Sequence, residues 1–237
     1  MLEKQAPAGF FGFLQEEVER LGGCPAAMCM VEHGARLYRE LQQREEEEGR
    51  GHVPVTHVGI VGCGHTLQRK RAAAERAFGI DGGLVFGSDG LDMPGIVPTL
   101  LHDRSHFLQG PAEDAQHLRQ LLTHARGQDE GKGGRALVAV TDDLRTTDPQ
   151  WMQQRAAALQ EALMDGDLVL LIQRQDRGPQ ACGLLNAEAV MAAGFELRRV
   201  ATSQRVGGEG GVLYSVALLK RCDEPTGSGL ELPQIPE

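Results

Sequence analysis

Residues able to bind a ligand gather where the first apolar run ends. Val58–Val61 leads directly into Gly62-Cys63-Gly64, and glycines at such a bend let the backbone turn sharply and come close to a ligand. An Ala/Arg-rich stretch with helical spacing follows at once, and the N–H groups that open a helix favour electron-rich atoms. A strand, a glycine turn and a helix in this order predict a site for a nucleotide-like ligand.

The cysteines and histidines form no comparable pattern. The five cysteines are scattered and include no CxxC pair, which argues against a disulfide framework and against a zinc site. His102, Asp103 and His106 have metal-ligating side chains, but no further cysteine or carboxylate stands at a firm spacing. An exposed loop is the better interpretation, and no metal site is expected.

The elements that position the turn alternate along the chain. After about Val53, runs of strand length alternate with stretches of helical periodicity, which predicts a largely parallel sheet with helices on both faces. The last two runs, 195–200 and 212–219, are joined by a Gly-rich segment that cannot hold a helical crossover. The final strand is therefore expected to insert antiparallel. The sequence predicts an α/β fold with a seven-stranded, mostly parallel sheet.

Three parts are expected along the chain. Residues 1–52 should form an N-terminal helical arm, residues 53–222 the α/β domain, and residues 223–237 a flexible tail rich in Pro, Gly and Glu. Apolar residues at helical spacing on both sides of Gly22-Gly23 predict two helices in the arm. The arm could cap a pocket, bind a second copy or a partner subunit, or simply pack, and these alternatives stay open.

Charge limits the partners. The net charge is −9, and the only compact basic cluster is Arg69-Lys70-Arg71, which we interpret as the exposed face of a helix. A dedicated nucleic-acid binder needs a Lys/Arg footprint for phosphates, so nucleic acid is not the expected partner. No apolar run approaches membrane-spanning length and no signal-peptide pattern opens the chain. The expectation is a reduced, cytoplasmic protein that does not use a membrane.

The order of elements resembles the class I S-adenosylmethionine-dependent methyltransferases over roughly residues 55–220. Gly62-Cys63-Gly64 is similar to the GCG turn that wraps the methionine and ribose part of the cofactor in that family. Residues 192–197 resemble the family's entry to strand six, and residues 212–220 resemble its closing strand. The resemblance implies S-adenosylmethionine as the cofactor and methyl transfer to an unidentified acceptor, with a small molecule or a protein favoured over nucleic acid.

The resemblance also implies roles for carboxylates near the strand ends. Asp89 would accept the ribose hydroxyls, a bidentate role that suits a carboxylate. Asp81, in a string similar to the family's GxD, is the alternative. Glu113 or Asp114 would serve at the adenine-binding turn that begins at Gly110.

Two further positions follow from the resemblance. His65, directly after the glycine turn, would contact the cofactor or the substrate, unless it is only a polar residue of the first helical turn. Asp142 and Asp143, at the end of strand four, would orient the acceptor or remove its proton. Helix caps or solvated loop residues are the alternative for this pair. Cys63 occupies a place that requires a small side chain, so it is a turn residue and not a nucleophile.

Three departures from the family pattern keep other functions open. Ile60 stands where a carboxylate usually contacts the amino group of the cofactor, Thr66 replaces the third glycine, and Pro111 replaces the usual adenine-turn aspartate. These changes favour a second interpretation, a catalytically inactive methyltransferase-like scaffold or partner subunit.

A third interpretation is an NAD(P)-binding Rossmann enzyme. Gly59-x-x-Gly62-x-Gly64 also suits the dinucleotide fingerprint, with Asp89 on a ribose. Leu67, however, stands near the expected third glycine and would obstruct close helix–strand contact. The terminal pair of strands also fits that fold poorly.

Overall fold

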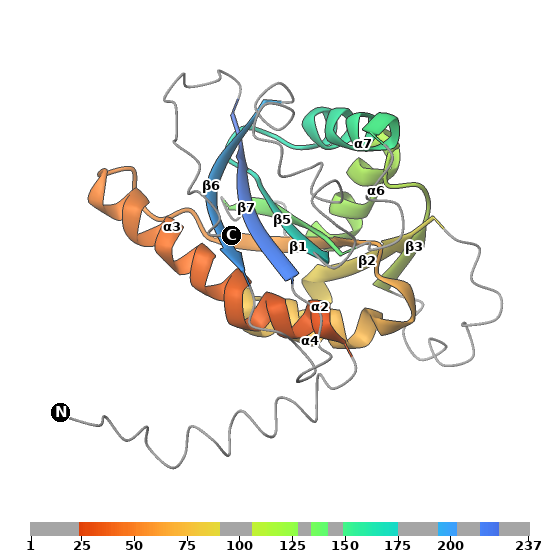
Figure 1. Ribbon diagram of the computed structural model, residues 1–237, viewed down its shortest axis with the longest axis horizontal. Coiled ribbons are helices and arrows are strands. Elements are labelled where there is room, and N and C mark those ends of the chain that lie inside the picture. The colour runs from red at the N-terminus through yellow and green to blue at the C-terminus, as the bar shows by residue number, and fades with distance from the viewer. Residues whose placement is uncertain are drawn as a thin grey trace, which may run out of the picture.

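The computed structural model describes residues 24–90, 106–127, 134–141, 149–174, 194–202 and 214–222. Within them a seven-stranded sheet has the order β3-β2-β1-β4-β5-β7-β6 (Figure 1). The strands are β1 (Val55–Val61), β2 (Val85–Asp89), β3 (Phe107–Gln109), β4 (Arg135–Val140), β5 (Leu168–Arg174), β6 (Phe195–Thr202) and β7 (Tyr214–Arg221). Neighbours from β3 to β5 are parallel, whereas β7 is antiparallel to β5 and to β6. The predicted α/β sheet and its antiparallel last strand are confirmed.

Helices cover both faces of the sheet (Figure 1). On one face lie α2 (Pro25–Cys29), the π-helical turn η1 (Met30–Gly34), α3 (Ala35–Glu47) and α4 (Leu67–Phe78). On the other lie α6 (Ala115–Arg126) and α7 (Pro149–Ala162). Two short 3₁₀ turns, η2 (Gly64–Thr66) and η3 (Gly82–Leu84), precede α4 and β2.

The alternation of side chains along β5 explains why helices must cover both faces. Leu168, Leu170 and Ile172 pack with the α2–α3–α4 side, and Val169 and Leu171 pack with the α6–α7 side. Successive side chains of a strand point to opposite faces, and a parallel strand buried on both faces is a continuous apolar run. The sequence of β5 has this character.

The helical segment 25–47 packs against the sheet. Its apolar side chains, including Met30, Leu37 and Leu41, belong to the same buried cluster as the strands. The Tyr38 hydroxyl accepts a hydrogen bond from the Val55 N–H at 2.9 Å, which ties α3 to the start of β1. The helices of the expected N-terminal arm thus contribute side chains to the domain core, from Cys24 to Leu41.

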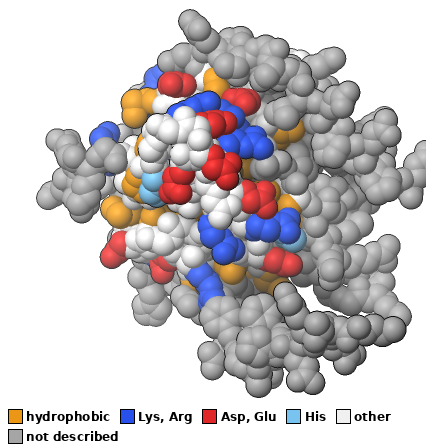
Figure 2. Space-filling view, turned by 90° about the vertical axis from the view of Figure 1, so that its left-hand side faces the viewer, with side chains coloured by type: hydrophobic (Ala, Val, Ile, Leu, Met, Phe, Trp, Pro, Cys, Tyr) orange, Lys and Arg blue, Asp and Glu red, His pale blue; other side chains and the backbone are white. Residues whose placement is uncertain are grey.

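A buried ionic cluster fixes the far end of α3. The Glu45 carboxylate accepts hydrogen bonds from Arg135 Nη2 at 2.6 Å and from Lys220 Nζ at 2.8 Å. Burial raises the pKa of Glu45, but the hydrogen bonds from Arg135 and Lys220 outweigh it, and the net pKa lies below the usual value. The cluster joins α3 to β4 and β7. On the side of the molecule where α3 ends, acidic and basic surface side chains are interspersed (Figure 2).

Two predicted features lie outside the described residues: the helix before Gly22 and the tail 223–237. No helix of the described ranges is both long enough and apolar enough to cross a membrane.

Candidate functional site

The glycine turn lies at the carboxyl end of β1, as the sequence predicted. Gly62 and Gly64 have φ angles of 68° and 52°, a region that is costly for residues with a Cβ atom. A Cβ atom built on Gly64 would meet nothing within 4 Å. No described residue therefore fills the space beside the backbone at Gly64, which leaves room for a ligand to approach it closely.

Asp89, the last residue of β2, contacts this turn. Its Oδ2 accepts a hydrogen bond from the Gly64 N–H at 3.0 Å. The Cys63 N–H donates to the Ser88 carbonyl at 3.1 Å, so the β1–β2 pairing continues to the turn itself. The structure thus brings Asp89 and the glycine turn together at one edge of the sheet.

The end of β3 joins the same edge. The Gly110 N–H donates to the Asp89 carbonyl oxygen at 3.1 Å. Gly110 lies against the buried His117 ring, because an added Cβ atom would stand 2.2 Å from Nδ1. His117 Nε2 is 2.5 Å from Ser88 Oγ, and burial lowers the pKa of His117 despite the opposing effect of Asp114. A neutral imidazole thus supports the turn that begins at Gly110.

The two acidic residues of that turn differ in their surroundings. Asp114 is the N-cap of α6, and its Oδ1 accepts the Gln116 N–H at 2.8 Å, a common stabilising role for aspartate. Glu113 is half-buried and directly precedes this N-cap. Asp114 is thus engaged as a helix cap, and the ligand role of either residue stays a prediction.

Asp81 lies at the opposite edge of the sheet. It precedes β2, and its Oδ1 accepts the Gly83 N–H at 2.7 Å as the cap of η3. Because β2 runs from Val85 to Asp89, the two candidate ribose ligands stand at opposite ends of one strand. Asp81 is not brought to the glycine turn, and Asp89 is.

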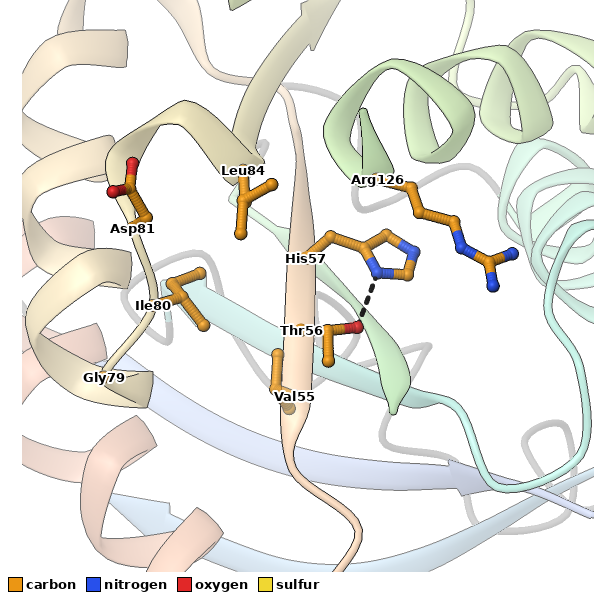
Figure 3. Close-up of a pocket in the computed structure, with 8 residues that line it drawn as sticks. All are labelled: Val55, Thr56, His57, Gly79, Ile80, Asp81, Leu84 and Arg126. Atoms are coloured by element: carbon orange, nitrogen blue, oxygen red, sulfur yellow. Dashed lines mark hydrogen bonds between the residues drawn. The ribbon is translucent and has the colours of Figure 1, made fainter. Parts of the chain in front are cut away.

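Asp81 instead borders a cavity of about 200 Å³ at the amino edge of the sheet (Figure 3). The cavity is lined by Val55, Thr56, His57, Gly79, Ile80, Asp81, Leu84 and Arg126. His57 is buried, and its Nδ1 is 2.9 Å from Thr56 Oγ1. Burial, with a smaller effect of Arg126, lowers the pKa of His57 to about 4.

Cys63 is a buried turn residue. It is fully buried, and desolvation raises the pKa of its thiol to about 12, with Lys70 opposing and Asp89 adding to the shift. The thiol is therefore protonated at neutral pH, and the thiolate is the reactive form of cysteine. This agrees with the interpretation that Cys63 is no nucleophile.

Several residues singled out from the sequence lie wholly or partly outside the described residues. The His65 backbone lies in η2, but its side chain is outside what the structure describes. Asp142 and Asp143 also lie outside the described residues, as do two of the three metal-type residues, His102 and Asp103. Within the described part of the chain, no three His, Cys, Asp or Glu side chains gather as a metal site would require.

Lys70 is buried, so the prediction that it lies on the exposed face of its helix is wrong. It is 5% exposed, and its Nζ donates to the Gly62 carbonyl and to Thr141 Oγ1, each at 2.9 Å. Lys70 follows Leu67 by three residues and precedes Ala74 by four, so the helical period places it on the buried face of α4. The helical spacing therefore indicated that Lys70 is buried. Grouping Lys70 with Arg69 and Arg71 as one basic cluster led to the opposite prediction.

The Leu67 side chain packs against Gly87 of β2. It is fully buried, and a Cβ atom on Gly87 of β2 would stand 2.2 Å from Leu67 Cδ1. The dinucleotide fingerprint uses a glycine on the helix for close packing. Here the helix carries the large side chain and β2 carries the glycine, which is the reverse arrangement.

No known family profile matches the chain, and no curated protein matches it. Among solved structures, it is similar to a TehB-like SAM-dependent methyltransferase from Corynebacterium glutamicum, with a TM-score of 0.48, 16% identity, and coverage of 91% of this chain and 100% of that chain. It is also similar to TrmN from Thermus thermophilus, with a TM-score of 0.47, 15% identity, and coverage of 88% of this chain and 53% of that chain. A third similar structure is the 1,6-didemethyltoxoflavin-N1-methyltransferase from Burkholderia thailandensis, solved with S-adenosylhomocysteine. Its TM-score is 0.45 and its identity 15%, with coverage of 94% of this chain and 93% of that chain. Similarity at this level decides nothing about activity, which has to be argued from the site.

Proposed function

We propose that the protein is an S-adenosylmethionine-dependent methyltransferase acting on an unidentified acceptor. The observation that carries this proposal is the hydrogen bond from the Gly64 N–H to the Asp89 carboxylate beside the open turn. It lies at the carboxyl edge of a sheet whose strand order reverses between β1 and β4. Open α/β sheets bind ligands outside the carboxyl ends of their strands at such a reversal.

The residues at this edge fit the cofactor. The Asp89 carboxylate has acceptor capacity for a ribose diol as well as for the Gly64 N–H. The half-buried Glu113 follows Gly110 by three residues, in the turn after β3 where we propose that the adenine binds. The space beside Gly64 allows the remaining part of the ligand to pass close to the backbone. Bound S-adenosylmethionine supplies an activated methyl group, so the protein mainly has to align the acceptor.

Asp142 and Asp143 are proposed to orient that acceptor or to accept its proton. They follow Thr141, whose N–H donates to the Val61 carbonyl at 2.9 Å and so fixes the chain next to the glycine turn. The net charge of −9 favours a small molecule or a protein over nucleic acid as acceptor. A cytoplasmic location and contacts with a second copy or a partner subunit through residues 1–52 complete the proposal.

One observation favours the inactive scaffold as the second candidate. Ile60, at the position of the usual carboxylate, is fully buried, and the ammonium of Lys70 lies on the Gly62 carbonyl. The glycine turn thus has a buried ammonium beside it and an apolar side chain at position 60. The resemblance implies a carboxylate there. A scaffold would keep the fold and lose the affinity for the cofactor.

Ligand binding by the full chain separates the candidates. Isothermal titration with S-adenosylhomocysteine should show one saturable site and a matching rise in melting temperature, and NADH should produce neither. No binding at millimolar S-adenosylhomocysteine would favour the scaffold, and a response to NADH alone would favour the dinucleotide enzyme. Tritiated S-adenosylmethionine with separated small-molecule and protein fractions of an extract would then identify the acceptor class.

A further inference from the structure

Lys70 is a buried cation at the carboxyl edge of β1. It lies in the first turn of α4, and its ammonium donates to the Gly62 carbonyl and to the Thr141 hydroxyl, each at 2.9 Å. Taking an ammonium out of water is costly unless hydrogen bonds or opposite charges compensate. The ammonium is therefore held by the backbone and side chains that it contacts.

Thr141 closes the network. It is 4% exposed, and its Oγ1 is 3.0 Å from both the Val61 and Gly62 carbonyl oxygens. A hydroxyl has one hydrogen, so it donates to one of these carbonyls at a time while it accepts from Lys70. We call Lys70, Gly62 and Thr141 the Lys70 brace.

The brace spans the reversal of the sheet. β1 and β4 are parallel neighbours with Val61 opposite Val140. The helix after β1 packs on one face, and the helix after β4 packs on the other. One arm of the brace therefore ends at the glycine turn, and the other ends at the residue directly before Asp142 and Asp143.

The strand order also predicts which part of a bound ligand would lie next to the Lys70 brace. From β3 to β4 the edge presents Gly110, then Asp89, then the glycine turn, then Thr141. A nucleoside with its ribose at Asp89 and its base toward Gly110 must extend its 5′ substituent toward Gly62 and Thr141. The amino-acid tail of the cofactor, and not its adenosine, would then be the part next to the Lys70 brace.

We propose that Lys70 is a positioning residue that sets the distance between the cofactor turn and the acceptor-side segment that starts at Thr141. This inference rests on the proposed function. Lys70 acts through Gly62 and Thr141 and need not touch the substrate. Arg71 provides a matched control, because it lies on the same helix and its Nη2 donates to another glycine carbonyl, that of Gly82, at 2.7 Å. Gly82 lies before β2, at the opposite edge of the sheet.

The experiment compares Lys70→Met, which keeps the aliphatic chain and removes the ammonium, with Arg71→Met. Dissociation constants are measured for S-adenosylhomocysteine and for 5′-methylthioadenosine, which lacks the amino-acid tail. Lys70→Met should weaken S-adenosylhomocysteine about tenfold, which is about 1.4 kcal/mol. It should weaken methylthioadenosine less than about twofold, because only the tail of the longer ligand would lie next to the brace. Amide hydrogen exchange at residues 62–64 should accelerate about tenfold in Lys70→Met and not in Arg71→Met.

Each other outcome has a defined meaning. Equal weakening of both ligands in Lys70→Met, or the same selective loss in Arg71→Met, would overturn the positioning role. If the unaltered protein binds neither ligand, the proposed function fails, and hydrogen exchange still decides the brace, because unchanged exchange at residues 62–64 refutes it. If Lys70→Met does not fold, Thr141→Val removes the other arm and should show the same selective loss.

Discussion

The Asp89 carboxylate and the Gly64 N–H lie 3.0 Å apart although 25 residues separate them in the chain. This hydrogen bond joins the end of β2 to the turn after β1, and it places a negative charge beside the open space at Gly64. One side chain therefore fixes the turn and lies at the edge where we propose that a ribose binds.

Replacing Asp89 should weaken cofactor binding far more than replacing Asp81. We expect Asp89→Ala to lower the affinity for S-adenosylhomocysteine about tenfold or more, because a charged acceptor is lost from the site. Asp81→Ala removes the cap of η3 at the other edge and should change the affinity less than about twofold. Isothermal titration checks both variants, and equal effects would mean that the ligand does not lie at the carboxyl edge.

Alanine substitutions at Gly64 and Gly49 distinguish the effect of backbone strain from the effect of lost ligand contact. Gly64 and Gly49 have φ angles of 52° and 70°, and an added Cβ atom would meet nothing within 4 Å at either. Alanine should cost about 1–2 kcal/mol of unfolding free energy at each position through strain alone. Only Gly64→Ala should also reduce S-adenosylhomocysteine binding, and a similar loss in Gly49→Ala would show that the loss comes from reduced stability.

The packing of Leu67 into Gly87 predicts an energetic coupling. Gly87→Ala should destabilise the protein by about 1–3 kcal/mol, because the new methyl group overlaps Leu67 Cδ1. In a Leu67→Ala background the same change should cost much less, since the overlapping atoms are absent. A double-mutant cycle from urea unfolding measures the coupling, and additive effects would contradict this account.

Removing the Glu45 carboxylate from its ionic cluster should be strongly destabilising. Glu45→Ala leaves Arg135 and Lys220 without their buried carboxylate, which typically costs about 3–5 kcal/mol. Glu48 pairs with Arg50 at 2.8 Å, with side chains that are 38% and 55% exposed. Glu48→Ala should therefore cost less than about 1 kcal/mol, and chemical denaturation of both variants tests the contrast.

His57 predicts part of the acid sensitivity of the fold. Its pKa is about 4 in the folded protein, against an ordinary value of 6.5, so the unfolded chain binds the proton more readily. The contribution of His57 is intact above pH 6.5 and is lost as the pH falls toward 4, by up to about 3 kcal/mol. In His57→Gln, the fall in unfolding free energy between these values should be shallower by that amount, and identical pH profiles would refute the assignment.

The main elements of the fold followed from local patterns. Alternating apolar runs and helical stretches indicated the parallel sheet, and the Gly-rich link before the last run indicated the antiparallel strand. The preference for Asp89 over Asp81 also came from the sequence, because Leu84-Val85-Phe86 is the better strand and places Asp89 at its carboxyl end. The inferences about the fold hold because period, turn residues and strand direction are properties of neighbouring residues. The structure confirms that Asp89 ends β2, and its role as ribose ligand stays a prediction.

The composition of the site was decided only by the tertiary structure. Periodicity places Lys70 on one face of α4, but it does not say that this face meets Gly62 and Thr141. Nor does any local pattern indicate that Gly87 accommodates Leu67 or that Glu45 meets Arg135. Each of these contacts joins residues far apart in the chain, and its energy depends on the burial and charge that packing creates. The sequence by itself determined the order and direction of the elements, and only their packing determined which polar groups are buried together at the carboxyl edge.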